Sequence, residues 1–308
     1  MLRTFFVRLS ENSSLRSFAE RSSLGRRVSG RFVAGTEIAD AVRATQVVNR
    51  SGMTVSIDNL GENVTNPDEA RHSAQLYHQI LDAIAANKLN ANISLKLTHM
   101  GLDVDESLAR EIVSGLVAKA ASMNPPGFVR VDMVGSPYTQ RTLEFVHELH
   151  RMPGNANSVG TVIQSYLRRS ESDVEKLLAE NIRIRLCKGA YTESADIAFA
   201  AKSDVDANYV KLMKILMKSR IYHGLATHDE NIVRQAEAFA RSEKISPDSF
   251  EFQMLYGIRR DLQQSLVRKG WRVRVYIPFG TEWYPYFMRR LGERPANVFF
   301  IARNLLRS

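Results

Sequence analysis

The sequence predicts an α/β fold, a TIM-like (β/α)8 barrel preceded by an N-terminal helical arm. Short apolar stretches with strand-like alternation recur eight times after residue 50, and a stretch with helix-like periodicity follows each of them. Strands that alternate with helices form a parallel sheet, and eight such units in roughly 250 residues are typical of a closed barrel. Because no shift in composition divides the 308 residues, we predict an arm over 1–50 and one barrel domain over 51–308.

The bulk composition limits the classes of function. Cys187 is the only cysteine, so no intrachain disulfide can form. We therefore expect a reducing compartment, the cytoplasm or, in a eukaryote, the mitochondrial matrix. No run of about 18 apolar residues exists, which excludes a membrane-spanning helix. The net charge of +9 suits nucleic acid, an anionic membrane surface or a phosphate-bearing cofactor, but the basic residues form no block typical of nucleic-acid-binding tails.

The N-terminal arm is rich in Ser and Arg, and its large apolar residues fall near helical spacing. They are Leu2, Phe5, Phe6 and Leu9. The composition resembles a transit peptide, but we favour an amphipathic arm whose basic face could rest on the inner face of a membrane. A further helix, opened by Thr36, is predicted over 36–50.

The predicted barrel units follow one another along the chain. The strands are Thr54–Asp58, Asn92–Leu97, Val129–Met133, Thr161–Tyr166, Ile182–Leu186, Tyr222–Thr227, Phe250–Leu255 and Val273–Ile277. The helices that follow them cover 67–88, 105–122, 138–150, 171–180, 194–219, 230–243, 257–269 and 283–293. A doubly wound open sheet is the alternative, but the sequence has neither the G-x-G-x-x-G turn nor a P-loop.

In a barrel of this type the functional residues gather where the strands end. Polar or charged side chains stand at nearly every predicted strand end: Asp58 and Glu62, Lys96, Asp132, Gln164 and Tyr166, Arg185 and Lys188, Thr227 and His228, Gln253, and Tyr276. Lys96 and Arg185 interrupt the apolar runs ISLKL and IRIRL, and a charge in a buried strand needs a partner or a ligand. For Lys96 a structural ion pair, with Asp132 as the candidate partner, and a ligand-binding role both stay open.

The segment Arg185–Tyr191, RLCKGAY, follows a predicted strand and has a glycine at the turn. Gly189 lets the backbone approach a bound group closely. The N–H groups of this turn, together with Lys188, could hold a phosphate at the start of the next helix. An ordinary turn between a strand and a helix is the alternative.

The segment Ala226–Asp229, ATHD, puts Thr227 and His228 at another strand end. A single histidine is more often a hydrogen-bonded polar residue than a ligand. His223 and His228 are five positions apart in a strand and point to opposite faces. Because neither H-x-H nor H-E-x-x-H occurs, we predict no metal site.

The segment Arg272–Asn297 predicts a strand, a turn and a helix that carries Arg289 and Arg290. Two arginines just past a strand end and close to tyrosines suit a small carboxylate with an apolar body, because an Arg fork pairs with a carboxylate through two parallel hydrogen bonds. Helical neighbours point about 100° apart, so an arginine that faces solvent is the alternative.

Eight stretches, most of them at predicted strand ends, together resemble one family, the FAD-dependent proline dehydrogenases in their monofunctional form. They are DNLGE (58–62), SLKL (94–97), VDMVGSPYTQRTL (131–143), VIQSY (162–166), IRLCKGAY (184–191), ATHD (226–229), EFQMLYG (251–257) and the stretch 272–297. Each motif alone is weak, whereas eight in this order are specific.

The resemblance implies that FAD lies across the barrel mouth and that L-proline binds between the flavin ring and the last helix. The implied catalytic residues are Asp132 and Arg185, with Asp132 also positioning Lys96. The implied substrate-binding residues are Lys96, Arg289, Arg290, Tyr276, Tyr286, Leu255 and Glu62, with Tyr191 beside the ring. The implied flavin contacts are Met133, Gln164, Lys188, Gly189, Ala190, Thr227, His228 and Gln253. The sequence departs from the family pattern at Cys187, where an aliphatic residue is common, and at Asp229, where asparagine is common and where the change could alter cofactor affinity.

The function implied by the resemblance is the oxidation of L-proline to 1-pyrroline-5-carboxylate in proline catabolism. A hydride passes from C5 to FAD, and the electrons continue to a quinone. Two alternatives belong to other classes. One is a metal-dependent barrel hydrolase that uses Asp132, His228 and Glu62, and the other is a basic protein that binds nucleic acid.

Overall fold

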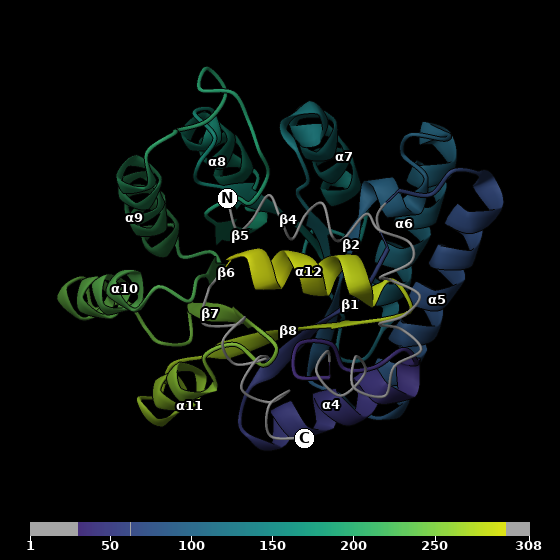
Figure 1. The fold of residues 1–308 in the computed structure, drawn as a ribbon, viewed down its shortest axis with the longest axis horizontal. Helices are drawn as coiled ribbons and strands as arrows, with labels where there is room; N and C mark the ends of the chain where they lie inside the picture. Colours follow the sequence, from purple (N-terminus) through teal and green to yellow (C-terminus); the bar gives the residue numbers. More distant parts are fainter. Residues whose placement is uncertain (1–29, 62, 294–308) are drawn as a thin grey trace.

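The computed structural model describes residues 30–61 and 63–293, with side chains as far as Met288. In this part of the chain eight parallel strands close into a barrel in the order β1 to β8, so the fold prediction is confirmed (Figure 1). The strands are β1 (Thr54–Asn59), β2 (Ala91–Lys96), β3 (Val129–Asp132), β4 (Val159–Gln164), β5 (Arg183–Cys187), β6 (His223–Ala226), β7 (Phe250–Leu255) and β8 (Val273–Phe279). Pairing of β8 with β1, from Thr54 with Arg274 to Asn59 with Phe279, closes the barrel.

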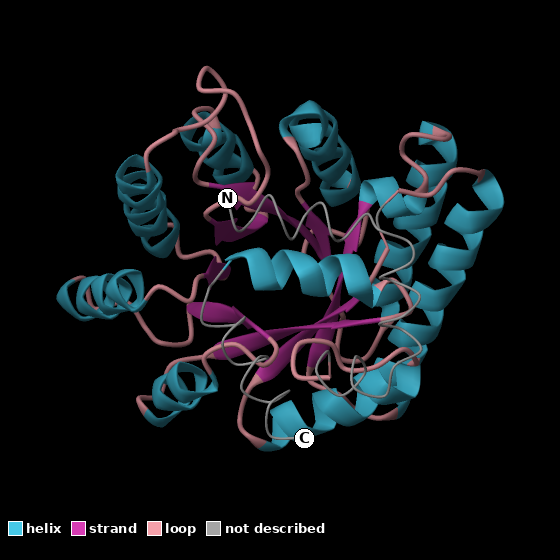
Figure 2. Ribbon diagram, in the orientation of Figure 1, coloured by secondary structure: helices cyan, strands magenta, loops and turns pink. Residues whose placement is uncertain are grey.

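Helices form a ring around the strands (Figure 2). The ring contains α4 (Ile38–Arg50), α5 (Pro67–Ala86), α6 (Glu106–Ser122), α7 (Thr139–Arg151), α8 (Ser170–Ala179), α9 (Lys202–Lys218), α10 (Glu230–Ser242) and α11 (Arg260–Arg268). The described residues also form α12 (Trp283–Glu293) and the short 3-10 helices η1 (Leu97–Met100) and η2 (Ser136–Tyr138). Across the described ranges, none of these helices combines the length and the apolar character that a bilayer-crossing segment requires.

Alternation along the strands separates an apolar exterior from a polar interior. Successive strand residues point to opposite faces, so Val55 and Ile57 pack into the core between the sheet and the helices. Ser56, which lies between them, points into the barrel, where its hydroxyl hydrogen-bonds with Asn92 and accepts a hydrogen bond from Arg185. The barrel interior is therefore a buried polar region that the apolar core surrounds.

The last helix does not take the place that a regular eighth unit would give it. Figure 1 shows α12 lying across the barrel mouth, while α4 lies against the outside of the barrel beside β1 and β8. The apolar face of α12, including Trp283 and Phe287, packs in one cluster with Phe32, Leu60 and Ile258. Since α4 already covers the wall at the β1–β8 junction, the apolar side of α12 is buried over the mouth instead.

The segment 188–201 after β5 is a loop, although the sequence predicted a helix from residue 194. Its backbone hydrogen-bonds with the chain that leaves β4: Arg168 N donates to Ile197 O at 3.0 Å and Phe199 N donates to Tyr166 O at 2.8 Å. These bonds hold the loop over the rim of the barrel, so that α9 begins only at Lys202.

The structure describes only residues 30–50 of the predicted arm over 1–50. Leu2, Phe5, Phe6 and Leu9 lie outside the described residues, and the predicted helix over 36–50 corresponds to α4. The boundary at residue 50 stays a prediction.

Candidate functional site

Two adjoining cavities lie where the strands end. The larger has a volume of about 1060 Å³ and is lined by residues that follow β1 and β2 and by α12. The smaller has a volume of about 470 Å³ and is lined mainly by residues at the ends of β3 to β7. Both volumes are in the range typical of small-molecule sites or somewhat above it. The two cavities share the lining residues Lys96, Ala190, Tyr191, Leu255 and Tyr276.

The expected site residues that the structure describes line these two cavities. All the expected flavin contacts line the smaller one: Met133, Gln164, Lys188, Gly189, Ala190, Thr227, His228 and Gln253. Asp132 and Arg185 line it too. The larger cavity is lined by Lys96, Leu255, Tyr276 and Tyr286. Glu62 and the side chains of Arg289 and Arg290 lie outside the described part, so their roles stay predictions.

Arg185 projects from β5 into the barrel and contacts residues of four other strands. Its Nη1 lies 2.6 Å from Asp132 Oδ1 and donates to Ser94 Oγ at 3.0 Å. Its Nη2 donates to Ser56 Oγ at 3.2 Å, and its Nε donates to the side-chain carbonyl of Gln253. Because the Arg185 side chain is only 8% exposed, its charge needs the Asp132 carboxylate as a partner.

Lys96 forms an ion pair with Asp58, whose Oδ2 lies 3.3 Å from the lysine Nζ. This corrects the expectation that Asp132 would be the partner. Asp132 stands opposite Lys96 in the β2–β3 register, but its carboxylate accepts from Arg185 and Tyr276. Burial raises the pKa of Asp58 above its ordinary value, although the Lys96 ammonium opposes that change.

Tyr276 connects the two ion pairs. Its hydroxyl donates to Asp132 Oδ2 at 3.1 Å, and the Asp58 carboxylate lies close enough to influence its pKa. The Arg185 guanidinium lies 5.3 Å from the centre of its ring. Burial raises the pKa of Tyr276 well above its ordinary value, and the carboxylates of Asp58 and Asp132 raise it further. The hydroxyl therefore remains a hydrogen-bond donor at every physiological pH.

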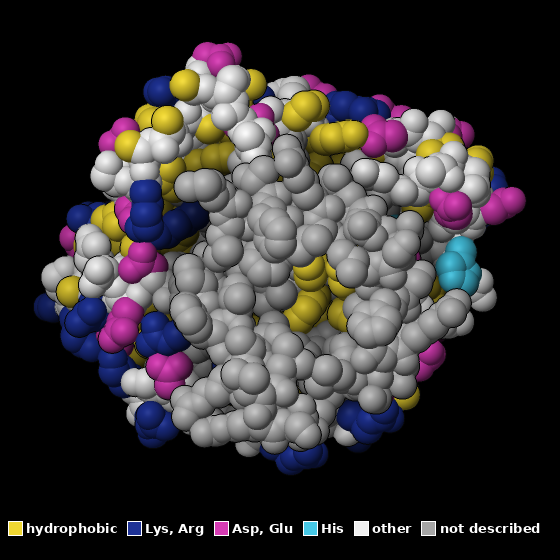
Figure 3. Space-filling model, in the orientation of Figure 1, with side chains coloured by type: hydrophobic (Ala, Val, Ile, Leu, Met, Phe, Trp, Pro, Cys, Tyr) yellow, Lys and Arg dark blue, Asp and Glu magenta, His cyan; other side chains and the backbone are white. Residues whose placement is uncertain are grey.

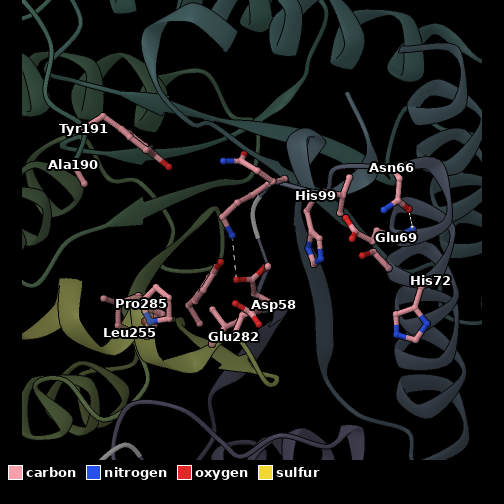
Figure 4. A pocket seen from close by; sticks show the side chains of 18 of the residues that line it. Asp58, Asn66, Glu69, His72, His99, Ala190, Tyr191, Leu255, Glu282 and Pro285 are labelled. Carbon is pink, nitrogen blue, oxygen red and sulfur yellow. Dashed lines mark hydrogen bonds and ion pairs between the residues drawn. The ribbon is translucent and has the colours of Figure 1, made fainter. Parts of the chain in front are cut away.

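Two further side chains support the larger cavity near Asp58. Tyr77 from α5 donates to Ser94 O at 2.8 Å, and its hydroxyl lies 3.2 Å from Asp58 Oδ1. Burial and the Lys96 charge lower the pKa of His99 to about 3, so this histidine is neutral. A Cβ atom at Gly61 would lie 2.3 Å from His99 Nε2, which shows how closely the chain leaving β1 passes over the ring. Figure 4 shows Asp58 and His99 on one side of this cavity, with Tyr191 and Ala190 on the opposite side.

Two features of the smaller cavity suit a ligand that donates a hydrogen bond and lies close to the backbone. Gln164 donates to Met133 O and Val134 O, but its buried Oε1 has no partner among the described residues. A buried acceptor left alone is costly, and a ligand N–H that enters the cavity would satisfy it. Gly189 has a φ of +106°, and a Cβ atom there would lie 2.2 Å from the Tyr166 ring, so only glycine keeps this turn against the cavity.

Four charged residues form what we call the rim cluster: Lys188, Lys202, Asp206 and Asp229. Lys188 Nζ lies 2.5 Å from Asp206 Oδ1 and 2.9 Å from Asp229 Oδ2. Lys202 pairs with Asp206, and its Nζ lies 3.8 Å from Asp229 Oδ2. The cluster links the loop after β5 with α9 and with the start of α10.

Sequence reasoning gave no role to several residues that the geometry brings into the site. Asp58 was noted only as a polar strand end, whereas Ser56, Ser94, Tyr77 and His99 were not singled out. Ser56 and Ser94 stand two positions before Asp58 and Lys96, on the same face of their strands, and that period could have identified them. Tyr77 carries no such signal, because it reaches the site from a helix. In the described ranges, no group of three or more His, Cys, Asp or Glu side chains is arranged to hold a metal ion.

Comparison with known proteins gives one consistent family. The model of the proline dehydrogenase family matches residues 41–303. The chain is 39% identical to proline dehydrogenase 1 from Bacillus subtilis (strain 168), and the match covers the full length of both proteins. It is 40% identical to proline dehydrogenase from Deinococcus radiodurans, over 90% of this chain and 89% of that protein.

A solved structure shares the fold. Proline utilization A (PutA) from Bdellovibrio bacteriovorus inactivated by N-propargylglycine matches with a TM-score of 0.82 at 23% identity. The match covers 94% of this chain and 36% of that one, so the chain spans about a third of the longer protein. At this identity the likeness concerns the fold alone. The matches to the family model and to full-length relatives carry the assignment: this chain belongs to the proline dehydrogenase family.

Proposed function

We propose that this protein is a proline dehydrogenase that oxidises L-proline to 1-pyrroline-5-carboxylate in proline catabolism, with FAD as its cofactor. FAD, when bound, accepts the hydride that leaves C5 of proline. The observation that carries the proposal is the meeting of two cavities, one lined by every expected flavin contact and the other by Lys96, Tyr276, Leu255 and Tyr286. The family assignment gives no support to a metal-dependent hydrolase.

The smaller cavity suits the cofactor. Gln164 Oε1 would accept a hydrogen bond from an N–H of the flavin ring, and the turn at Gly189 with Lys188 would face its phosphates. His228 is held in place because the Leu255 N–H donates to its Nε2 at 2.9 Å. These groups hold and orient the cofactor, and none of them needs to move a proton.

The larger cavity suits the amino acid. Lys96 would bind the proline carboxylate, together with Arg289 and Arg290 from α12, while Glu62 would pair with one arginine and close the site. Tyr276, Tyr286, Leu255 and Tyr191 would surround the ring. Asp58 holds the Lys96 ammonium at the cavity wall, and so it acts as a positioning residue.

Arg185 would place a fixed positive charge beside the cofactor in a region from which water is excluded. A charge that is already oriented stabilises developing negative charge without reorganising during the reaction. Asp132 and the two serine hydroxyls keep the guanidinium in one orientation. Asp132 and Arg185 therefore act as one unit in the proposal.

The electrons would continue to a quinone, and the basic arm would bring the protein to the inner face of a membrane, so the proposal puts the chain in the cytoplasm with peripheral membrane contact. Reduction of a soluble ubiquinone analogue in the presence of proline tests the acceptor. Co-sedimentation with anionic vesicles tests the membrane contact.

The decisive experiment is an absorption spectrum of the purified full-length protein, followed by anaerobic addition of L-proline. Flavin bands that bleach with L-proline support the proposal, whereas a colourless protein or bands that proline does not change would refute it.

Arg289→Met and Arg290→Met should each lower kcat/KM for proline while the FAD content stays unchanged.

A further inference from the structure

The rim cluster lies where the proposed cofactor would bring its negative charges. Three of its members, Lys188, Lys202 and Asp229, line the smaller cavity, whereas Asp206 does not. The cluster has two ammonium groups and two carboxylates, so its formal charges cancel. Figure 3 shows basic and acidic side chains next to one another over α9 and α10, the side of the mouth to which Asp206 and Asp229 belong.

A diphosphate carries two negative charges, and Lys188 is the cation expected to meet it. In this structure Lys188 already contacts two carboxylates, within 3 Å of each. An incoming phosphate must therefore share the ammonium with these carboxylates or displace one of them. Asp229 is the carboxylate that faces the same cavity, so it also repels the phosphate directly.

We propose that Asp229 lowers the affinity of this protein for the diphosphate of FAD, because it competes for Lys188 from inside the cofactor cavity. The inference rests on the proposed function and adds a determinant of cofactor retention to it. Binding then requires Lys188 to exchange a carboxylate partner for a phosphate partner.

The structural role of Asp229 can be separated from its charge. Asp229 caps α10, since its side chain accepts from Asn231 N at 3.1 Å. Burial opposes ionisation, but Lys188, the Asn231 N–H and Lys202 together hold the pKa of Asp229 below its ordinary value. The residue is thus a carboxylate at neutral pH. Asparagine is an equally good cap, so Asp229→Asn removes the charge and keeps the helix start.

The test measures the dissociation constant of FAD for the full-length protein after its flavin has been removed, by the quenching of flavin fluorescence in 0.1 M salt. Asp229→Asn should bind FAD about 3- to 10-fold more tightly than the wild type. The reason is that it removes a negative charge whose repulsion of the diphosphate is only partly screened by salt. Asp206→Asn is the matched control. It removes the same charge from the same lysines but outside the cavity lining, so it frees Lys188 without removing a charge that faces the phosphate, and it should tighten binding less than Asp229→Asn does. The rate of FAD loss on dilution of the holoprotein should rank the three proteins in the same order.

The advantage of Asp229→Asn should also shrink at 1 M salt, where the screening length falls from about 10 Å to about 3 Å. An unchanged dissociation constant in Asp229→Asn would overturn the inference, as would equal tightening in both variants. A wild type that binds no FAD at all would instead refute the proposed function.

Discussion

The ion pairs inside the barrel, which we call the inner pairs, and the rim cluster contain the same kinds of charge in different surroundings. The inner pairs, Lys96 with Asp58 and Arg185 with Asp132, have side chains that are at most 13% exposed. In the rim cluster the exposed fraction runs from 25% at Asp229 to 76% at Lys202. Tyr276 and two serine hydroxyls fix the inner groups, whereas Lys188 divides its contacts between two carboxylates.

The comparison shows that burial decides what an ion pair is suited for. Breaking a buried pair leaves an uncompensated charge away from water, so the partners are held to each other. Breaking an exposed pair costs little, because water and salt replace the partner. The inner pairs are therefore suited to orienting a reaction, and the rim cluster is suited to exchanging one anion for another.

The largest expected effect comes from breaking an inner pair. Arg185→Met leaves Asp132 buried without its cation and should lower the free energy of unfolding by about 3–5 kcal/mol. The matched change in the rim cluster, Lys202→Met, should cost less than about 1 kcal/mol. Urea unfolding of both variants at neutral pH measures the contrast. Similar losses in the two variants would contradict the distinction between the regions.

Lys96→Met tests the second inner pair through substrate binding. Loss of one charged hydrogen bond to the proline carboxylate should cost about 1.5–3 kcal/mol, or roughly ten- to 150-fold in kcat/KM. Steady-state kinetics with L-proline measures the effect, and FAD content should not change. Lys211→Met removes a lysine that pairs with Glu171 outside the site and should behave like the wild type. Normal kinetics in Lys96→Met would remove the lysine from the proposed carboxylate site.

Tyr276→Phe removes the hydroxyl that joins the inner pairs and keeps the ring over Arg185. Because the acceptor is a carboxylate, this hydrogen bond contributes about 1.5–3 kcal/mol, and that is the expected loss in the free energy of unfolding. Tyr138→Phe is the control, because the Tyr138 hydroxyl donates to Asp103 in an exposed position. Its loss should be only a few tenths of a kcal/mol. Thermal or urea unfolding resolves the two, and equal losses would mean that the inner hydroxyl does not couple the pairs.

The smallest effect is a difference in pH dependence between Asp58→Asn and Asp229→Asn. The pKa of Asp58 is raised by burial above its ordinary 3.8, so folding disfavours its ionised form, and the stability of the wild type relative to Asp58→Asn falls as pH rises above 3.8. Burial raises the pKa of Asp229, but Lys188, the Asn231 N–H and Lys202 together lower it below 3.8. Its contribution is therefore complete above pH 3.8 and is lost only as pH falls below it.

Urea unfolding at pH 4, 5 and 6 separates the two behaviours. The stability gap between the wild type and Asp58→Asn should change over this range, whereas the gap for Asp229→Asn should stay constant. A constant gap for Asp58→Asn would show that the Lys96 ammonium fully offsets the burial of its partner.

Much of the barrel and of the site's composition could be predicted from the sequence. Eight alternating strand and helix units predicted the closed barrel, and the family resemblance of the motifs at the strand ends supplied the expected flavin contacts, which line one cavity. These features are local, because a strand's alternation and the residue at its end depend on a few neighbours in the chain. The loop over 188–201 was predicted less well, since its conformation depends on hydrogen bonds with the distant exit of β4.

The sequence by itself determined which charged and polar groups stand at the strand ends. Only the tertiary structure decided which of them meet. Asp132 is the register neighbour of Lys96, yet Arg185 reaches Asp132 from β5, and Lys96 pairs with Asp58 on β1. Closure of the barrel brings β1, β2, β3, β5 and β7 around one guanidinium, and α4 covers the wall beside β8 so that α12 lies over the mouth. The physical reason is that a side chain inside a closed barrel pairs with whichever group lies at the same height and in the direction in which it points. The spacing of residues along the chain does not encode either quantity.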